Sequence, residues 1–192
     1  MMPKQILKKY WGFDQFRPVQ QDIVESVLNN QDTLALLPTG GGKSICFQVP
    51  ALLKEGLTLV ISPLIALMKD QVEGLKKKGI RAEAIFSGMH HTQVDRILDN
   101  AIYGNVKILY LSPERIKSRM FSDRLERMNV DLIAVDEAHC ISQWGIRLQT
   151  QLSGNSVTQR KSRFGSAGYC TYGYSNQTRC RRHSGKAFIQ SQ

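Results

Sequence analysis

The sequence contains little that would place it in a membrane or in an oxidising compartment. Its 192 residues include no apolar run that approaches the roughly 20 residues needed to cross a bilayer. The first segment, residues 1–9, is too polar for the apolar region of a signal peptide. Cysteines are few, and Cys46 and Cys140 lie in apolar or motif-like stretches, as expected for reduced thiols of a cytosolic protein. We therefore expect a cytoplasmic protein with no membrane partner.

Acidic side chains are missing from the last part of the chain. Residues 146–192 contain eight Lys or Arg, no Asp or Glu, and no helical or strand periodicity. The whole chain has 26 basic and 16 acidic residues, so residues 1–145 hold 18 basic residues against the same 16 acidic ones. A net charge of +10 is typical of nucleic-acid-binding proteins. Here most of it comes from the tail, so we give the charge little weight.

A glycine-rich run lies between a predicted strand and a predicted helix. Leu37-Pro-Thr-Gly-Gly-Gly-Lys-Ser44 follows a short apolar run and precedes residues 44–53, whose apolar side chains suit a packed helix. Successive glycine N–H groups at a helix start can bind phosphate oxygens, a Lys can reach the terminal phosphates, and a Ser hydroxyl can ligate Mg²⁺. The strict pattern has Gly where Leu37 stands. The run predicts a nucleotide site made by Thr39, Gly40, Gly41, Gly42, Lys43 and Ser44.

An acidic pair later in the chain supplies what the glycine loop lacks. Val135-Asp-Glu-Ala-His139 follows a short apolar run. Asp136 at the end of a buried strand can hold the Mg²⁺ shell together with Ser44, and Glu137 can orient and deprotonate the attacking water. A solvated strand end is the alternative interpretation, but it does not explain why the pair accompanies a glycine loop.

Five apolar stretches of strand length alternate with helical stretches; they are residues 32–38, 58–63, 82–86, 106–113 and 132–135. This alternation predicts an α/β fold with a mostly parallel sheet and helices on both faces. Ligands on such sheets bind beyond the carboxyl ends of the strands, where the motifs lie. We find no internal repeat and no low-complexity linker, so residues 1–145 are predicted to form one domain.

Residues 3–145 resemble the first RecA-like lobe of a RecQ-family DNA helicase, a P-loop domain. The resemblance rests on the glycine run and on three further segments. They are Trp11-Gly-Phe-Asp-Gln-Phe-Arg-Pro-Val-Gln-Gln21, Ser62-Pro-Leu-Ile-Ala-Leu-Met-Lys-Asp-Gln-Val72 and Asp136-Glu-Ala-His-Cys-Ile-Ser-Gln-Trp-Gly145. The last is close to a signature, because other proteins of the DEAH type do not usually continue Cys-Ile-Ser-Gln-Trp-Gly.

The resemblance implies nucleotide contacts before the glycine loop. Phe13 would stack on adenine, Gln20 would hydrogen-bond the base edge, and Arg17 would approach the nucleotide. A carboxamide suits a base edge because it offers a donor and an acceptor together. The alternative for Phe13 is a place in the helix-packing core.

The resemblance also implies contacts with single-stranded DNA. Lys69, Gln71, Ser112 and Arg115 would touch phosphates, which fixes register without reading sequence; a solvated face is the alternative. His139 would link the nucleotide site to a DNA-sensing loop that begins with Gln143 and Trp144. Trp144 is a candidate stacking platform, although a lone Trp is more often part of a packed core.

The tail departs from the family pattern. There, the loop continues with an acidic-aromatic-basic run, and a strand ending in Ala-Leu-Thr-Ala-Thr follows; residues 146–192 show neither. Codons permitted for residues 168–174, read one base later, give Val-Ile-Ala-Leu-Thr-Ala-Thr, and residues 146–150 and 180–190 give family-like segments at the same offset. An extra base near Trp144-Gly145 would therefore explain an aberrant basic tail that is disordered or irregular.

The basic tail has two alternative interpretations. One is a genuine basic extension that binds nucleic acid. The other is a zinc site at Cys170, Cys180 and His183, whose spacing lacks the usual paired ligands and a fourth partner.

In the family, the missing strand lies between the glycine-loop strand and the acidic-motif strand. Without it, both strands would carry unpaired N–H and C=O groups, so we expect an unstable chain.

These observations predict a motor lobe of an ATP-dependent 3′ to 5′ DNA helicase that binds ATP–Mg²⁺ and DNA, nucleoid-associated if the source is bacterial. No unwinding is expected from this chain alone, because a second lobe normally supplies an arginine finger worth roughly 10³–10⁵ in rate. Two other classes stay open. One is a non-enzymatic nucleic-acid-binding fragment with a basic tail, and the other is a nucleotide triphosphatase outside the helicases.

Overall fold

The computed structural model describes residues 1–38, 40–136, 168–172 and 186–190. The helices in this part of the chain are α1 (Pro3–Trp11), α2 (Gln20–Leu28), α3 (Lys43–Leu53), α4 (Ile65–Lys77), α5 (His91–Ile102), α6 (Pro113–Ile116) and α7 (Arg119–Leu125). The strands are β1 (Asp32–Leu36), β2 (Leu57–Ile61), β3 (Ala82–Ile85), β4 (Ile108–Leu111), β5 (Val130–Val135), β6 (Gly168–Tyr172) and β7 (Lys186–Gln190). The five strands expected in residues 32–135 are confirmed.

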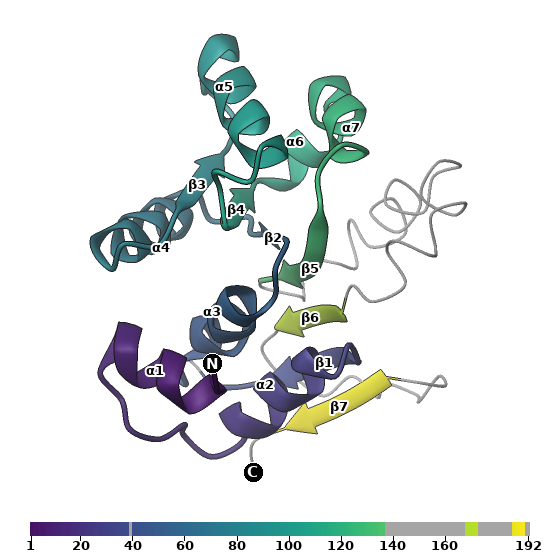
Figure 1. Ribbon diagram of the computed structural model, residues 1–192. Helices are drawn as coiled ribbons and strands as arrows, with labels where there is room; N and C mark the ends of the chain where they lie inside the picture. Colours follow the sequence, from purple (N-terminus) through teal and green to yellow (C-terminus); the bar gives the residue numbers. More distant parts are fainter. Residues whose placement is uncertain (39, 137–167, 173–185, 191–192) are drawn as a thin grey trace.

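The described strands form one sheet in the order β3-β4-β2-β5-β6-β1-β7, and every recorded pair is parallel. Figure 1 shows β1 lying between the two tail strands, with α1 and α2 at this end of the molecule. Parallel strands of one sheet require crossover connections, and helices α3, α4 and α5 lie in those from β1 to β2, from β2 to β3 and from β3 to β4. The predicted α/β fold with a parallel sheet is confirmed.

Each face of the sheet is buried under its own helices. On one face, residues such as Val60, Tyr110 and Ala134 pack against the apolar sides of α2, α3 and α4. On the other face, the neighbouring residues Leu59, Leu109 and others pack against α5, α6 and α7. Successive strand residues point to opposite faces, so a strand covered on both sides is apolar throughout, as β2 is.

The tail contains two strands, which the sequence did not predict. Backbone pairing joins β6 to β5 on one side and to β1 on the other, with Leu132 opposite Gly168 and Thr33 opposite Cys170. The expectation of a missing strand between β1 and β5 was therefore wrong for this structure. Ladder hydrogen bonds use only main-chain N–H and C=O groups, so an extended segment without strand periodicity can still fill the position.

Among the described residues, no helix combines the length and the apolar character required to span a bilayer.

Candidate nucleotide-binding site

The glycine loop connects the carboxyl end of β1 to the start of α3, as the sequence predicted. Gly40 and Gly42 both have left-handed backbone conformations, with φ of 75° and 73°. Between them, the Gly41 N–H donates to the Pro38 carbonyl at 3.0 Å, and a Cβ at Gly41 would come within 2.9 Å of that oxygen. The tight path therefore requires glycine at these positions. Thr39 lies outside the described residues.

Helix α3 begins directly at Lys43, with Gly42 as its N-cap. The first turn of a helix carries main-chain N–H groups without intrahelical acceptors, and its dipole favours an anion. Lys43 and Ser44 thus stand where a phosphate group would meet both the helix start and a cationic side chain. The structure places these two predicted residues together with Gly40, Gly41 and Gly42.

Asp136 lies at the same edge of the sheet, immediately after β5. Its main-chain N–H donates to the Ile61 carbonyl at 2.8 Å, which holds it at the carboxyl end of β2 and β5. One strand separates β5 from β1, so the two strand ends are about 10 Å apart at the usual strand spacing. Asp136 and the glycine loop therefore lie at the same edge of the sheet.

The magnesium assignment fits this donor set. Among the described residues, no group of three or more His, Cys, Asp or Glu side chains is arranged to hold a metal ion. Magnesium in nucleotide sites usually takes one or two protein oxygens and completes its shell with phosphate and water. Ser44 and Asp136 are the candidate protein oxygens here. Glu137 and His139 lie outside the described residues, as do Gln143 and Trp144.

The side chains of Arg17, just before α2, and of Gln20, at its start, hydrogen-bond to the main-chain carbonyls of the glycine loop. The Gln20 amide nitrogen donates to the carbonyls of Gly41 at 2.9 Å and Gly42 at 3.3 Å, and its oxygen accepts from the Arg17 N–H at 2.9 Å. The Arg17 guanidinium donates to the Gly40 carbonyl at 2.6 Å. Gln20 is buried, whereas Phe13 is 52% exposed. In this structure the Gln20 amide binds the loop itself, and its contact with a base edge stays a prediction.

The predicted DNA contacts lie in two different environments. Lys69 is exposed on α4, with its ammonium 4.8 Å from the centroid of the Phe86 ring. Arg115 donates to the carbonyls of Phe86 at 3.0 Å and Met89 at 3.2 Å, so its guanidinium holds the turn after β3. Ser112 is buried, and its hydroxyl has no hydrogen-bond partner in the described part of the chain. Of the two cationic residues, Lys69 is exposed to solvent and Arg115 is half-buried.

A buried polar group that the sequence analysis missed lies behind the glycine loop. Gln48 on α3 donates to the Gln71 side-chain oxygen at 2.8 Å and to the Tyr110 hydroxyl at 3.0 Å. Burial raises the pKa of the Tyr110 hydroxyl, the bond from Gln48 lowers it, and the nearby Asp136 carboxylate raises it further. A glutamine inside the apolar stretch 45–53 was the signal that could have revealed it.

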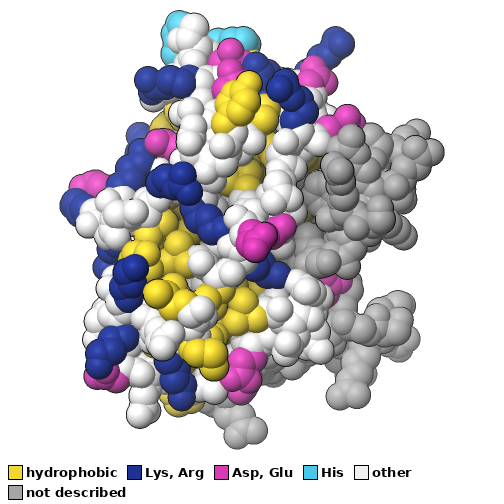
Figure 2. Space-filling model, in the orientation of Figure 1, with side chains coloured by type: hydrophobic (Ala, Val, Ile, Leu, Met, Phe, Trp, Pro, Cys, Tyr) yellow, Lys and Arg dark blue, Asp and Glu magenta, His cyan; other side chains and the backbone are white. Residues whose placement is uncertain are grey.

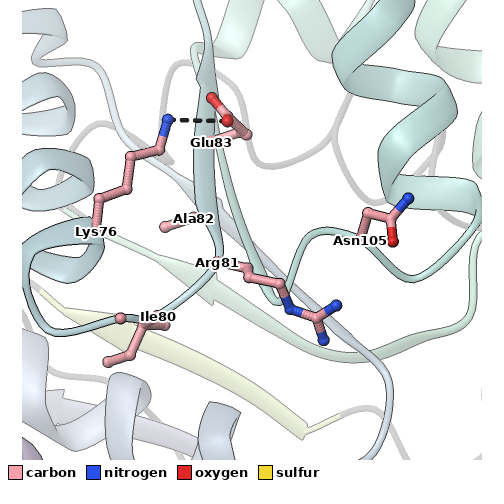
Figure 3. A pocket seen from close by; sticks show the side chains of 7 residues that line it. Lys76, Ile80, Arg81, Ala82, Glu83 and Asn105 are labelled. Carbon is pink, nitrogen blue, oxygen red and sulfur yellow. Dashed lines mark hydrogen bonds and ion pairs between the residues drawn. The ribbon is translucent and has the colours of Figure 1, made fainter.

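Other surface features lie apart from this site. The pocket in Figure 3 lies at the amino end of β3, and the Lys76 ammonium is 2.8 Å from the Glu83 carboxylate beside it. Its lining consists of Lys76, Gly79, Ile80, Arg81, Ala82, Glu83 and Asn105. Because the glycine loop follows the carboxyl end of β1, this pocket belongs to the opposite edge of the sheet. Figure 2 shows basic side chains spread over the described part of one face, interleaved with apolar ones.

Comparison with known proteins decides the family. The sequence matches the DEAD/DEAH box helicase family over residues 17–170, which is most of the chain. The chain belongs to the DEAD/DEAH box helicase family. The match runs from Arg17 beside the glycine loop through β5 and into β6, so it includes Gln20, the glycine loop and Asp136 but not Phe13.

Individual helicases show the same relationship. The chain is 45% identical over 152 residues to the ATP-dependent DNA helicase RecQ of Haemophilus influenzae, covering 78% of this chain and 25% of that protein. It is 47% identical over 141 residues to RecQ of Bacillus subtilis, covering 73% of this chain and 24% of that protein. The chain thus spans about a quarter of the length of these relatives, and it corresponds to an N-terminal RecQ-type lobe.

Solved structures confirm the helicase fold. The DUF1998 helicase MrfA bound to DNA has a TM-score of 0.72 and 16% sequence identity, covering 90% of this chain and 26% of that chain. A hypothetical ATP-dependent RNA helicase from Sulfolobus tokodaii has a TM-score of 0.63 and 16% identity, covering 91% of this chain and 50% of that chain.

Proposed function

We propose that this chain is the first motor lobe of an ATP-dependent DNA helicase that moves 3′ to 5′, and that it binds ATP–Mg²⁺ and single-stranded DNA. The observation that carries the proposal is the glycine loop at the start of α3, held by Gln20 and Arg17 at the same sheet edge as Asp136. The RecQ helicases to which the chain is similar support it.

Each predicted residue has a distinct task in this proposal. The N–H groups of Gly40, Gly41, Gly42 and the first turn of α3 bind phosphate oxygens, and Lys43 neutralises the terminal phosphates. Ser44 and Asp136 would hold Mg²⁺, which would offset the charge of the phosphates. Phe13 would cover the adenine ring, which agrees with its exposed position.

The remaining roles concern catalysis and DNA. Glu137 orients and deprotonates the attacking water, and His139 transmits the state of the nucleotide to the segment that begins with Gln143 and Trp144. Lys69 offers a phosphate contact on α4, joined by Gln71. Arg115 and Ser112 are proposed to contact phosphates after β4, Arg115 through the donors of its half-buried guanidinium that do not bond to Phe86 and Met89.

Strand separation is not expected from the 192-residue chain. Coupled hydrolysis normally needs a second lobe that closes on the nucleotide and contributes an arginine finger, worth roughly 10³–10⁵ in rate. The relatives are about four times as long as the segment they share with this chain. We therefore propose weak ATP–Mg²⁺ binding and no unwinding. Measurable duplex separation by the purified chain would contradict this.

A binding experiment separates the proposed function from its main alternative. Titration of a fluorescent single-stranded oligonucleotide, with and without a non-hydrolysable ATP analogue and Mg²⁺, would use the full chain, Lys43→Ala and a deletion of residues 146–192. The motor-lobe proposal expects analogue binding that is lost in Lys43→Ala and retained after the deletion. Oligonucleotide binding that survives Lys43→Ala and vanishes with the deletion would instead indicate a basic nucleic-acid-binding fragment.

The frame of the tail needs its own test, since the boundary at residue 145 rests on the sequence alone. We propose an extra base near Trp144-Gly145 and a tail, residues 146–192, that is translated out of frame. The support comes from the sequence, because the shifted codons of residues 146–150, 168–174 and 180–190 encode family-like segments at one common offset. Resequencing the coding DNA should reveal the extra base, with an open frame beyond it. A clean sequence in the present frame would overturn the proposal.

A further inference from the structure

Gln48 is a polar residue buried in the middle of an otherwise apolar helix segment. Only 3% of its surface is exposed, and its neighbours Phe47 and Val49 are buried apolar residues. Its amide nitrogen has two hydrogens and two acceptors, the Gln71 carboxamide oxygen at 2.8 Å and the Tyr110 hydroxyl at 3.0 Å. Since both donors are used inside the protein, the orientation of this amide is fixed by its partners.

The two acceptors lie on elements that belong to different parts of the motor lobe. Tyr110 is in β4, fully buried, and its ring packs edge-on against Phe47 with centroids 6.4 Å apart. Gln71 is on α4, the helix that also carries Lys69. Gln48 itself lies five residues after Lys43 on α3, which is roughly one and a half helical turns from the glycine loop.

The partner on α4 is suited to make two contacts at once. Gln71 is half-buried, and its oxygen accepts from Gln48. No hydrogen bond of its amide nitrogen to another residue is recorded in the described part of the chain. A carboxamide carries its acceptor and its donors on different atoms, so an oxygen held by Gln48 leaves the nitrogen able to donate to a second group.

We propose that Gln48 is a positioning residue that couples nucleotide occupancy of the glycine loop to phosphate binding by Gln71 on α4. A phosphate group bound at the first turn of α3 restrains the helix, and Gln48 moves with it. Its directional hydrogen bond then sets the plane of the Gln71 amide, while Tyr110 provides a fixed reference in the sheet. The inference rests on the proposed function, because it needs both ligands to bind the same chain.

Such coupling is reciprocal and can be measured as one ratio. The dissociation constant of a fluorescent single-stranded oligonucleotide is measured without nucleotide and with a saturating non-hydrolysable ATP analogue plus Mg²⁺. Their ratio is the coupling factor, and we expect it to differ from one by roughly five-fold or more in the unmodified chain. A purely structural role of Gln48 would change stability and leave this ratio where it is.

Gln48→Met is the test variant, because methionine has a similar length and fills the same space without hydrogen-bonding strongly. We expect its coupling ratio to fall to about one, while its affinity for the analogue alone changes by less than about three-fold. Gln71→Met should lower the ratio equally, and the double variant should show no further loss, since both remove one interaction. Gln93→Met, at an exposed glutamine on α5, is the matched control and should keep the ratio.

The outcomes separate this inference from the proposed function. An unchanged ratio in Gln48→Met, or a ratio of one in the unmodified chain, would overturn the inference while both ligands still bind. Failure of the unmodified chain to bind either ligand would overturn the proposed function and this inference with it. If Gln48→Met does not fold, Gln71→Met carries the test alone, because its side chain is only half-buried; an unchanged ratio there also overturns the inference.

Discussion

The side-chain amide nitrogen of Gln20 lies 2.9 Å from the carbonyl oxygen of Gly41, and the two residues are 21 positions apart in the sequence. Through this bond, the start of α2 determines the shape of the glycine loop before any nucleotide is present. The Arg17 guanidinium holds the same loop at the Gly40 carbonyl, at 2.6 Å. We therefore expect Gln20 to pre-organise the proposed phosphate site.

Replacing Gln20 by Ala removes both bonds to the loop and the bond from the Arg17 N–H. A buried hydrogen-bonding group that loses its partner costs about 1–3 kcal/mol, so we expect Gln20→Ala to weaken ATP-analogue binding by roughly 5- to 100-fold. Isothermal titration calorimetry measures this. The control is Gln21→Ala, which removes an exposed side chain bonded only to Glu25. Equal affinities of the two variants would show that Gln20 does not organise the loop.

Gly42 combines a left-handed backbone with a close neighbour. A Cβ there would lie 2.5 Å from the Gln20 amide nitrogen. Gly42→Ala should therefore lose analogue binding and also lower the free energy of unfolding by more than the roughly 1–2 kcal/mol that left-handed backbone costs a non-glycine residue. Gly79→Ala is the control, because Gly79 has φ of 75° and nothing within 4 Å of its added Cβ. Its urea midpoint should fall less, with analogue binding intact.

Tyr110 makes stability depend on alkaline pH. Burial raises the pKa of its hydroxyl above the ordinary value of 10.0. The unfolded chain then releases a proton that the folded chain still holds, so the contribution of Tyr110 is complete below about pH 10 and is lost as the pH rises further. We expect the unfolding free energy of the unmodified chain to fall more steeply above pH 10 than that of Tyr110→Phe, by up to about 1.4 kcal/mol per pH unit.

The matched variant for this experiment is Tyr103→Phe, since Tyr103 is 73% exposed at the end of α5. Its unfolding free energy should follow that of the unmodified chain across the alkaline range. Identical slopes for Tyr110→Phe and the unmodified chain would contradict the assigned burial of the Tyr110 hydroxyl.

Lys107 closes the turn between α3 and β2. Its ammonium donates to the carbonyls of Lys54, Glu55 and Gly56, the last two at 3.0 and 2.8 Å. Burial lowers the pKa of Lys107, an effect that Asp131 opposes. Lys107→Met leaves three carbonyls without this donor, and we expect a loss of about 1–3 kcal/mol in the free energy of unfolding, measured in urea. Lys78→Met, at an exposed lysine, should change it by less than about 0.5 kcal/mol.

The core of the fold was predictable because its signals are local. Each of the five strands in residues 32–135 is an apolar run of strand length, and a parallel sheet covered on both faces needs such runs. Strand β6 was not predictable, because residues 168–172 have no apolar period and were recruited by main-chain pairing with β1 and β5. Sequence patterns report side chains, and this pairing does not depend on them.

The parts of the candidate site marked by glycines and charged residues could be predicted from the sequence. The parts that depend on contacts between distant residues could not. Gly40 and Gly42 adopt the backbone that the motif requires. Val19, by contrast, has a left-handed backbone with φ of 71° just before Gln20. This conformation is rare for a β-branched residue, so the sequence does not predict it. The sequence predicts that Arg115 is either solvated or bound to DNA. In the structure its guanidinium donates to the carbonyls of Met89 and Phe86, 26 and 29 positions away. Such partners are set by the tertiary fold.

The most direct test of the account is the binding of a fluorescent, non-hydrolysable ATP analogue with Mg²⁺ to the full chain and to Lys43→Ala. Lys43 begins α3 immediately after the glycine loop, so Lys43→Ala removes the charge proposed to neutralise the terminal phosphates and keeps the three loop glycines. We expect saturable binding to the full chain and its loss in Lys43→Ala, with both chains showing the same unfolding transition. Equal binding to the two proteins would contradict the claim that this loop is a nucleotide site.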